Sequence, residues 1–308
     1  MIDVKEHIPL ASYTTFKIGG LARYFVEVKS EDKIREAVAW AKERGLRHIL
    51  LSGCSNVLIP DEGLDALVIH ISSENHSFAD TELVADAGCD LLALIREAGK
   101  RGLGGWEKLA GIPGSIGGAI RGNAGAFGSE IKDFAMKVRA YDGERGEMRE
   151  FESPICDFSY RHSYFKDHPE WIITHVYVAL RKVDPLESEK LATETIRERE
   201  KRHLQNVQAA GSFFMNPVAS PDIVAMFEQE KNVKSREQRV PAGWLIEKAG
   251  LKGAKEGGAI ASLQHPNYIV NTGGATARDV LTLAARIKEA VKSQFGVELK
   301  EEAAILSR

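Results

Sequence analysis

Residues 104–128 constrain the fold of this chain more than any other segment, because nine of its 28 glycines fall within these 25 residues. The run includes Ala110-Gly-Ile-Pro-Gly-Ser-Ile-Gly-Gly118 and Asn123-Ala-Gly-Ala126. Glycine has no Cβ, so a dense set of glycines lets the backbone approach a ligand or another backbone closely. The segment therefore predicts a surface made of main-chain N–H groups rather than of side chains.

A second loop of small residues, Ser52-Gly-Cys-Ser-Asn56, follows a predicted buried strand over 48–51. Backbone N–H groups together with neutral serine and asparagine donors suit a pyrophosphate. Neither loop contains the Gly-Lys-Ser/Thr of a Walker loop, and residues 114–118 lack the G-x-G-x-x-G spacing of a Rossmann turn. Glycines in turns are more often structural than ligand-binding, but two such loops in one chain favour a dinucleotide site outside the Rossmann class.

Local signals place the first helices and strands. Residues 23–28 are strand-like, and Ser30 caps a helix with one apolar face. Asp90 opens a second helix, and Gly102 lies past its end. Strands and helices thus alternate through the first hundred residues.

The rest of the chain has a different pattern. Residues 137–183 are predicted mainly as strands, and a charged helix over 187–203 leads into a C-terminal region. There, Thr276 and Asp279 open a long amphipathic helix that Gly296 ends. These patterns predict an α+β chain, best divided near residues 186–205.

Composition and charge exclude several classes of protein. With 308 residues and 44% hydrophobic content, the chain is long enough for about two domains. It carries 41 basic and 44 acidic residues, so no excess positive charge is available to bind nucleic acid or a membrane surface. No apolar stretch approaches the ~18 residues that span a bilayer, and charges occupy the place of a signal peptide's apolar core. We expect a cytoplasmic protein without nucleic-acid or membrane partners, whose oligomeric state the sequence leaves open.

The three cysteines, Cys54, Cys89 and Cys156, are an odd set without C-x-x-C spacing. This pattern argues against both a disulfide framework and a structural zinc site. We expect buried or partly buried thiols and predict no metal site.

Ordered motifs along nearly the whole chain narrow the interpretation. Besides the two glycine loops they are Tyr13-Thr-Thr-Phe-Lys-Ile-Gly-Gly20, Tyr160-Arg-His-Ser-Tyr-Phe165, Gly211-Ser-Phe-Phe-Met-Asn-Pro217, Pro241-Ala-Gly-Trp-Leu-Ile-Glu247, Leu251-Lys-Gly253, His265-Pro-Asn-Tyr268 and Val270-Asn271. In this order the motifs resemble the UDP-N-acetylenolpyruvoylglucosamine reductases (MurB), flavoenzymes of the FAD-binding class that also includes the vanillyl-alcohol oxidases.

The resemblance implies a fold and a reaction. The expected fold is an FAD-binding domain of two subdomains, a small α/β one over 1–70 and an antiparallel-sheet one over 71–200. An α+β substrate-binding domain over 201–296 follows, and a C-terminal strand over 297–308 returns toward the FAD domain. The implied reaction reduces UDP-N-acetylenolpyruvoylglucosamine to UDP-N-acetylmuramate with non-covalent FAD and NADPH, in peptidoglycan precursor synthesis for the bacterial cell wall. The preference for NADPH over NADH stays open.

The same resemblance assigns FAD binding to the two glycine loops. The residues are Ser52, Gly53, Cys54, Ser55, Asn56, Gly111, Ile112, Gly114, Ser115, Gly117, Gly118, Asn123, Ala124 and Gly125.

Three residues match the family's catalytic positions. Arg161 would hold a carboxylate and stabilise developing negative charge, because a guanidinium is planar and stays cationic. Ser212 would donate a proton to the substrate carbanion, and Glu302 would assist charge stabilisation or reprotonation. The structural alternatives are an ion pair for Arg161, a turn for Ser212 and a solvent-facing side chain for Glu302. Glu301 is the fallback carboxylate, since adjacent residues of a strand face opposite sides.

Candidate substrate ligands are Asn216 and Asn267, with Tyr160, Lys252 and His265 as weaker choices; His265 could equally be a core histidine. Met215 departs from the family, which usually has lysine there, and a thioether cannot offset phosphate or carboxylate charge. Lys201, Arg202 or Lys252 could compensate.

Two other functions stay open at this level. One is an FAD oxidase of the same class acting on another sugar or alcohol, which leaves Arg161, Ser212 and Glu302 unexplained. The other is a UDP-sugar-binding protein that has lost catalysis, and Met215 is the only residue that supports this interpretation.

Overall fold

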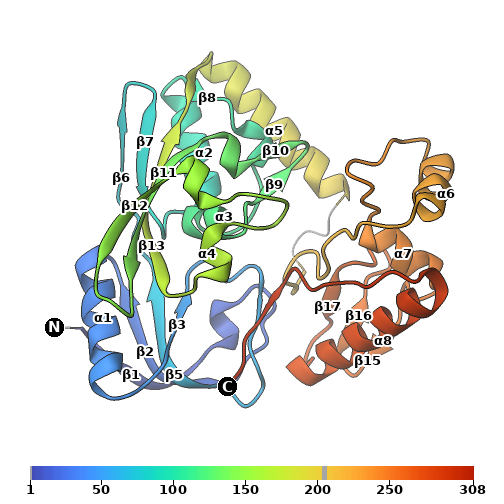
Figure 1. Cartoon of the computed structure of the whole chain (residues 1–308), viewed down its shortest axis with the longest axis horizontal. Coiled ribbons are helices and arrows are strands. Elements are labelled where there is room, and N and C mark those ends of the chain that lie inside the picture. The colour runs from blue at the N-terminus through green and yellow to red at the C-terminus, as the bar shows by residue number, and fades with distance from the viewer. Residues whose placement is uncertain (1, 203–206) are drawn as a thin grey trace. The chain divides into compact units, whose positions relative to one another are not determined.

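The computed structural model describes residues 2–202 and 207–308, with the backbone alone for Arg202. The chain forms two compact units, each assembled from separate stretches of sequence. The first unit consists of Met1–Ile8, Ala22–Cys54 and Asp65–Lys201, and the second of Pro9–Leu21, Ser55–Leu64 and Arg202–Arg308. Figure 1 shows the chain coloured from blue to red along its length.

One part of the first unit is a small α/β layer. Its sheet has the order β1-β2-β5-β3, with β3 and β5 parallel. Helix α1 packs on this sheet through a stripe of four buried residues, and Ser30 caps it by accepting the Lys33 N–H at 3.3 Å. The bounds are β1 Lys5–Pro9, β2 Leu21–Val28, α1 Glu31–Glu43, β3 His48–Leu51 and β5 Leu64–Ile71.

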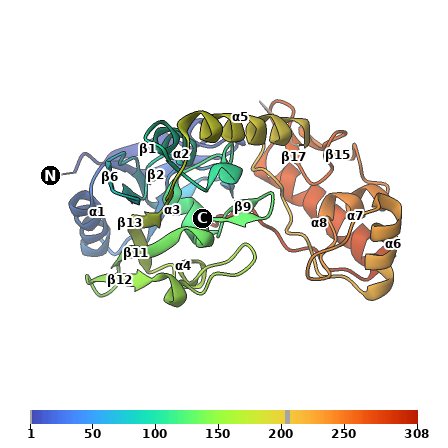
Figure 2. The ribbon, with the colours of Figure 1, turned by 90° about the horizontal axis from the view of Figure 1, so that it is seen from above.

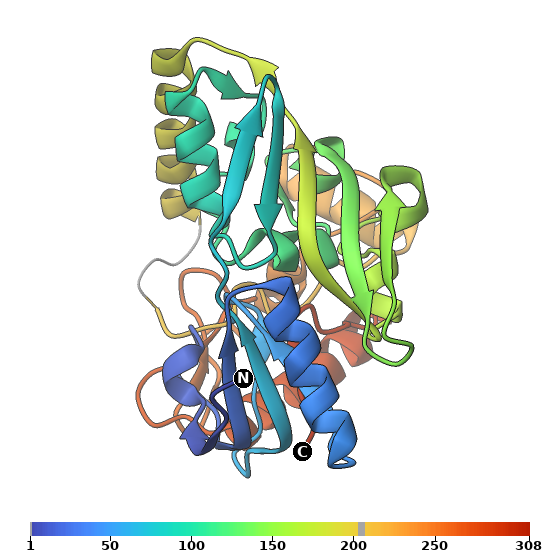
Figure 3. The ribbon, with the colours of Figure 1, turned by 90° about the vertical axis from the view of Figure 1, so that its left-hand side faces the viewer.

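The other part of the first unit is an antiparallel sheet of order β12-β11-β13-β7-β6. Figure 3 shows its cyan and green strands side by side, with helices against it. Trp106 and Phe151 are fully buried in its core. The bounds are β6 His76–Ala79, β7 Glu82–Asp86, α2 Leu91–Lys100, β8 Leu103–Gly104, α3 Ile116–Arg121, β9 Gly125–Ala126, β10 Ser129–Glu130, β11 Ala135–Asp142, β12 Met148–Glu152, α4 Tyr164–Asp167, β13 Trp171–Ala179, β14 Arg181–Lys182 and α5 Pro185–Arg202.

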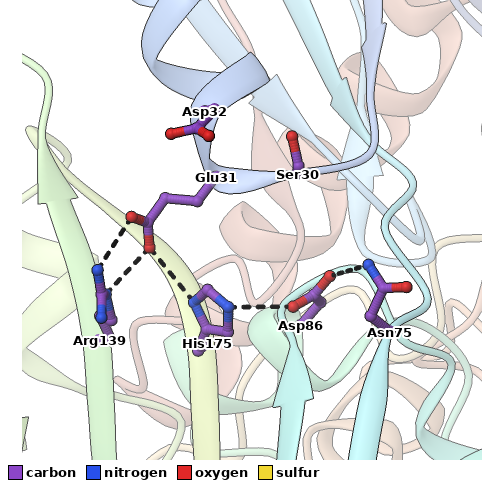
Figure 4. Close-up of a pocket in the computed structure, with 7 residues that line it drawn as sticks. All are labelled: Ser30, Glu31, Asp32, Asn75, Asp86, Arg139 and His175. Carbon is purple, nitrogen blue, oxygen red and sulfur yellow. Dashed lines mark hydrogen bonds and ion pairs between the residues drawn. The ribbon is translucent and has the colours of Figure 1, made fainter.

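A chain of polar contacts links the two parts of the first unit (Figure 4). Glu31, in the first turn of α1, pairs with Arg139 of β11 at 3.0 Å and lies 3.5 Å from Nδ1 of His175 on β13. His175 Nε2 lies 3.2 Å from Asp86, whose other oxygen accepts from Asn75 at 3.0 Å. These side chains line a pocket of about 450 Å³ that contains none of the predicted FAD or substrate residues. We therefore interpret the cluster as a link that orients α1 on the sheet.

In the second unit, a long helix, α8, packs on a three-stranded antiparallel sheet. Its helices α6, α7 and α8 are drawn in orange and red in Figure 2. Asp61 caps α8 from a distant part of the sequence, because its carboxylate accepts the N–H groups of Ala277 (2.7 Å) and Arg278 (3.1 Å). The bounds are β4 Val57–Leu58, α6 Pro221–Lys231, α7 Ala242–Lys248, β15 Lys255–Glu256, β16 Ala259–Ala261, β17 Ile269–Asn271, α8 Ala277–Phe295 and β18 Ala304–Ile305.

The last strand closes the second unit. β18 pairs in parallel with β4, so the C-terminus lies beside residues 57 and 58. The Ala304 N–H donates to the Asn56 carbonyl (2.9 Å), and Leu306 donates to Leu58 (3.0 Å). Residues 55–64 thus belong to the same folded unit as the C-terminal third of the chain.

The structure confirms the α+β class and the helix signals. Ser30, Asp90 and Thr276 each cap a helix with a side-chain hydrogen bond, and Gly296 ends α8 in the left-handed conformation. The predicted helix over 187–203 corresponds to α5, which begins two residues earlier; its predicted last residue, His203, lies outside the described residues. The three cysteines are free and buried, as predicted. Within residues 2–202 and 207–308, none of the helices has the length and apolar character to cross a membrane.

Candidate active site

Within the first unit, residues 52–54 of the first glycine loop lie against the second loop at Gly114 and Ser115. A Cβ on Gly53 would stand only 2.5 Å from Gly114 Cα and 2.8 Å from the Ser115 nitrogen. Such separations are far below any real Cβ contact, so only glycine allows the two backbones to approach this closely. The loops that the sequence analysis treated as one dinucleotide cradle are therefore neighbours in space.

Hydrogen bonds fix the second loop at the start of α3. Ser115 caps α3 and accepts the Gly118 N–H at 3.3 Å, while the Gly114 carbonyl accepts from Leu91 at 3.1 Å. Gly117 packs against Ala87, where a Cβ would meet the Ala87 side chain at 2.7 Å. The loop is thus held between the ends of β7 and α2.

Asn123 joins this loop to the segment that carries Arg161. It is fully buried, and its amide nitrogen donates to the Ser159 carbonyl (2.8 Å) and to Glu130 (3.1 Å), while its oxygen accepts the Lys132 N–H (3.3 Å). Through these bonds the Asn123 side chain connects its own segment to two others of the first unit, at residues 130–132 and at Ser159. Any contact between this residue and FAD stays a prediction.

Arg161 has an unusual backbone conformation. Its φ is 57°, in the left-handed region that costs a side-chain-bearing residue about 1–2 kcal/mol. The reciprocal bonds of Ser159 and His162 (3.1 Å each) and the bond from Lys166 Nζ to the Arg161 carbonyl (2.9 Å) hold this turn. The guanidinium donates to the Gly125 carbonyl at 3.2 Å and lies 5.3 Å from the Tyr160 ring. Arg161 is therefore in direct contact with the second part of the glycine-rich segment, residues 123–126.

In the second unit, Ser212 and Glu302 lie on adjacent backbone segments. The Glu302 N–H donates to the Phe213 carbonyl at 2.8 Å, and Phe214 faces Glu301 in an antiparallel bridge. Ser212 follows Gly211, whose φ of 72° turns the chain into this segment. Two of the three predicted catalytic residues, 90 positions apart in the sequence, thus lie near each other.

The same contacts separate the roles of Glu301 and Glu302. Glu301 accepts Lys288 Nζ at 2.8 Å, which ties it to α8. Glu302 instead bonds through its N–H to Phe213, the residue next to Ser212. Its carbonyl accepts from Asn56 Nδ2 at 3.1 Å. This arrangement favours Glu302 over Glu301 as the catalytic carboxylate.

Asn267 is buried and bonded on both sides of its amide. Its Oδ1 accepts the Phe214 N–H (3.0 Å), its Nδ2 donates to the Phe214 carbonyl (2.8 Å), and its own carbonyl accepts from Phe213 (2.7 Å). These bonds position the segment that follows Ser212. A direct contact with substrate stays a prediction for Asn267.

The other predicted substrate residues differ in their surroundings. Asn216 accepts the Ala242 N–H at 3.0 Å, and Lys252 forms an ion pair with Glu247 at 2.8 Å. The ring of His265 contacts the ring of Tyr268 in an edge-to-face arrangement, and burial lowers the pKa of His265 below its ordinary value. A neutral imidazole in this place suits hydrogen bonding better than charge neutralisation.

One cation outside the predicted set, Arg239, contacts this segment, because its guanidinium donates to the Asn216 carbonyl (2.9 Å). Met215 donates its N–H to the Lys300 carbonyl (2.9 Å), which is a contact of the two backbones. No local pattern in the sequence indicates the Arg239 contact, since the two residues lie 23 positions apart. Of the compensating residues that the sequence suggested, Lys201 lies 3.8 Å from Glu198, and the Arg202 side chain lies outside the described residues.

Cys54 is a buried thiol in a strained backbone position. Its φ is 46°, its Sγ lies 3.0 Å from the Ser52 carbonyl, and burial raises its pKa to about 11. It therefore stays protonated at neutral pH and acts as a small packed side chain rather than as a nucleophile.

The remaining predicted FAD residues lie at backbone contacts. Gly111 packs on Arg199 of α5, and Gly125 pairs with Glu130 across β9 and β10. Ile112 and Ala124 donate to the carbonyls of Leu109 and Ala119, whereas Ser55 and Asn56 belong to the second unit.

The chemistry of the cradle fits FAD. Loops 52–56 and 110–118 offer main-chain and hydroxyl donors without carboxylates, and two glycine backbones meet where a Cβ would collide. A diphosphate requires such close, uncharged or positive surroundings.

Comparison with known protein families matches both parts of the chain. Residues 22–152 match the family of FAD binding domains, and residues 202–306 match the UDP-N-acetylenolpyruvoylglucosamine reductase C-terminal domain. Both predicted glycine loops fall within the first match, and Ser212 and Glu302 fall within the second.

Similar proteins cover nearly the whole chain. UDP-N-acetylenolpyruvoylglucosamine reductases from Carboxydothermus hydrogenoformans and Solibacter usitatus are 37% and 36% identical, over 98% of this chain and 94% and 96% of theirs. The crystal structure of UDP-N-acetylenolpyruvylglucosamine reductase (MurB) from Thermus caldophilus is 30% identical, covers all of both chains and superposes with a TM-score of 0.79.

Proposed function

Because the chain belongs to the UDP-N-acetylenolpyruvoylglucosamine reductase family, we propose that its residues carry out the NADPH-dependent reduction of UDP-N-acetylenolpyruvoylglucosamine to UDP-N-acetylmuramate. The chain is an FAD-dependent oxidoreductase of peptidoglycan precursor synthesis. We place this activity in the cytoplasm.

When bound, FAD would supply the hydride-transfer chemistry between NADPH and the enolpyruvyl group. The backbone of Gly53, Gly114 and Ser115 would hold its diphosphate, with Ser52, Gly117 and Gly118 beside them. Negative charge develops next to the substrate carboxylate during the reduction, and one proton must be added. The protein therefore has to supply a cation and an acid.

Arg161 supplies the cation. Its bond to the Gly125 carbonyl and its left-handed backbone support this role, because strained residues that a structure holds in place are typical of functional sites. The guanidinium binds the substrate carboxylate and stabilises the charge on the adjacent carbon.

Ser212 supplies the proton and Glu302 supports it. A hydroxyl is a weak acid, but a carbanion-like carbon is basic enough to take its proton when the geometry is fixed. The Phe213 N–H donates to the Asn267 carbonyl and the Glu302 N–H donates to the Phe213 carbonyl, so the backbone next to Ser212 is fixed. This observation carries the proposal, because the two backbone segments that bear Ser212 and Glu302 are neighbours although they are distant in the sequence.

Most candidate substrate ligands belong to the second unit. They are Asn216 and His265, and Tyr160 of the first unit is a further candidate for binding the sugar and its substituents. Lys252 is a weaker candidate because Glu247 already neutralises it.

The test separates the two half-reactions in Ser212→Ala. NADPH should still bleach the flavin colour at the wild-type rate, whereas the return of colour on adding the UDP-sugar should slow by about 10²–10⁴-fold. Ser220→Ala is the matched control, because this exposed serine makes no side-chain capping bond.

Equal loss of both half-reactions in Ser212→Ala would exclude the proton-donor role. Turnover that depends on oxygen and another sugar, without any dependence on the enolpyruvyl UDP-sugar, would instead favour the oxidase alternative. Binding of the UDP-sugar to protein that is purified without flavin would favour a binding protein without catalysis.

A further inference from the structure

One face of α3 combines a single cation with two glycines. Gly118, Arg121 and Gly122 lie three and four residues apart and therefore on the same side of the helix. This side is exposed or half-buried, while the other four residues of the helix are buried. Ser115, the buried residue that caps α3, lies one turn before Gly118.

Packing within the protein does not require these two glycines. A Cβ on Gly118 would meet only Ser115 Oγ, at 3.4 Å, and one on Gly122 only the Gly118 carbonyl, at 3.6 Å. Both are ordinary contact distances, and neither glycine has a positive φ. The face is thus open, in contrast to Gly53 and Gly117, which touch protein backbone.

Arg121 has a fixed backbone and an uncommitted guanidinium. Its carbonyl accepts Ser163 Oγ at 2.8 Å. In residues 2–202 and 207–308 its guanidinium forms neither a hydrogen bond nor an ion pair with the protein. Although the side chain is exposed, the surrounding protein atoms desolvate it and lower the pKa of Arg121 below its ordinary value. An anion at this place would restore the lost stabilisation.

The geometry of helices directs Arg121 toward the cradle. A long side chain in a helix leans over the preceding turn, toward the helix N-terminus. For Arg121 this turn carries Gly118, which offers no side chain to block it, and beyond it lie Ser115 and Gly114.

The two glycine loops contribute no cation of their own, although Arg199 of α5 packs on Gly111. Residues 52–56 and 110–118 contain neither lysine nor arginine, whereas the diphosphate of FAD carries two negative charges. We propose that Arg121 binds the FAD diphosphate and supplies the positive charge that the glycine loops lack.

This inference rests on the FAD-dependent function proposed above, but it is independent of the substrate and of Ser212. We therefore test it by cofactor binding alone. FAD is removed from the full-length protein, and calorimetry measures the binding of FAD and of ADP, which carries the same diphosphate without the flavin ring.

Arg121→Met should weaken both ligands by about ten- to hundredfold, as expected for loss of one hydrogen bond to a charged group. Arg121→Lys should recover part of this loss, because it keeps the charge without the planar fork. The control is Arg96→Met on α2, an exposed arginine that makes the same change in net charge; its affinities should stay within about twofold of wild type. Higher salt should reduce the difference between wild type and Arg121→Met.

Unchanged FAD affinity in Arg121→Met would overturn the proposal and leave Arg121 as a favourable charge at the end of α3. Weakened FAD with unchanged ADP would also overturn it, because the contact would then be to the flavin. Thermal unfolding of the FAD-free variants shows whether Arg121→Met has a folding defect. If it has one, Arg121→Lys decides. A wild-type melting temperature of Arg121→Lys with intermediate FAD affinity supports the proposal, and wild-type FAD affinity contradicts it.

Discussion

At the scale of single residues, Gly53 shows how much a missing atom can determine. In Gly53→Ala the new Cβ would stand 2.5 Å from Gly114 Cα, so one of the two loops must move. We expect the free energy of unfolding to fall by about 1–3 kcal/mol, as in other overpacked sites. We also expect weaker FAD retention, because the cradle is displaced.

Chemical denaturation and the FAD content of purified protein measure this change. Gly243→Ala is the matched control, because its Cβ would make only ordinary contacts of 3.7 Å and it lies within α7. Wild-type stability and FAD content in Gly53→Ala would show that the loops tolerate separation and that the contact is not needed.

Single residues also mark the limit of sequence reasoning. The glycine density at 104–128 predicted a main-chain surface, and the structure confirms that backbone meets backbone at Gly53 and Gly114. The amide bonds of Asn123 and Asn267 were not predicted, because a motif identifies the residue but not the groups that surround it. Those partners lie 36 and 53 positions away in the sequence.

At the scale of elements, Asn267 acts as a clamp on the segment after Ser212. In Asn267→Ala, the N–H and the carbonyl of Phe214 lose their partners in a buried place. Each unsatisfied group costs about 1–3 kcal/mol, so we expect the free energy of unfolding to fall by about 2–6 kcal/mol in total. Denaturant unfolding followed by tryptophan fluorescence measures it.

Gln264→Ala provides the comparison, since this side chain is exposed in the same loop. An Asn267→Ala protein with wild-type stability and a selectively raised KM for the UDP-sugar would contradict the clamp and support a direct substrate contact. A loss of stability together with a lower kcat would support positioning.

Helices with local capping signals were predictable for a physical reason. The Thr276 hydroxyl and the Asp279 carboxylate satisfy N–H groups within three residues, so the sequence alone contains both partners. The second cap on α8, from Asp61, was not predictable, because it comes from a loop more than 200 residues earlier. The ion-pair link between Glu31 and His175 was missed for the same reason.

At the scale of the whole molecule, half-buried histidines predict a loss of stability in acid. Desolvation lowers the pKa of His48, His70 and His265 below the ordinary value of 6.5. In the unfolded chain these residues take up protons near that pH, while in the folded protein they stay neutral until a lower pH. The unfolded state therefore binds more protons, and the free energy of unfolding falls as the pH drops below about 6.5.

Melting temperatures measured from about pH 7.5 to about pH 5.5 test this expectation. The double variant His48→Gln/His70→Gln should show a smaller fall than wild type, and His7→Gln, with its exposed side chain, should show the wild-type fall. A double variant that follows the wild-type curve would assign the acid sensitivity to other groups.

The division of the chain illustrates what sequence patterns leave out. Composition and helix signals suggested a change near residues 186–205, and the structure divides the long segments after Lys201. The assignment of residues 9–21 and 55–64 to the second unit depends on contacts such as those from Asp61 and Asn56 to the C-terminal region. Such contacts leave no local trace in the sequence.

The pairing of β18 with β4 has a consequence for how the protein is made. On the ribosome, the partner strand at Val57–Leu58 is made long before Ala304–Ile305. The second unit can therefore acquire its complete native pairing only once both segments have been synthesised, and a gene fragment that encodes residues 202–308 alone would yield a chain lacking one side of its own fold.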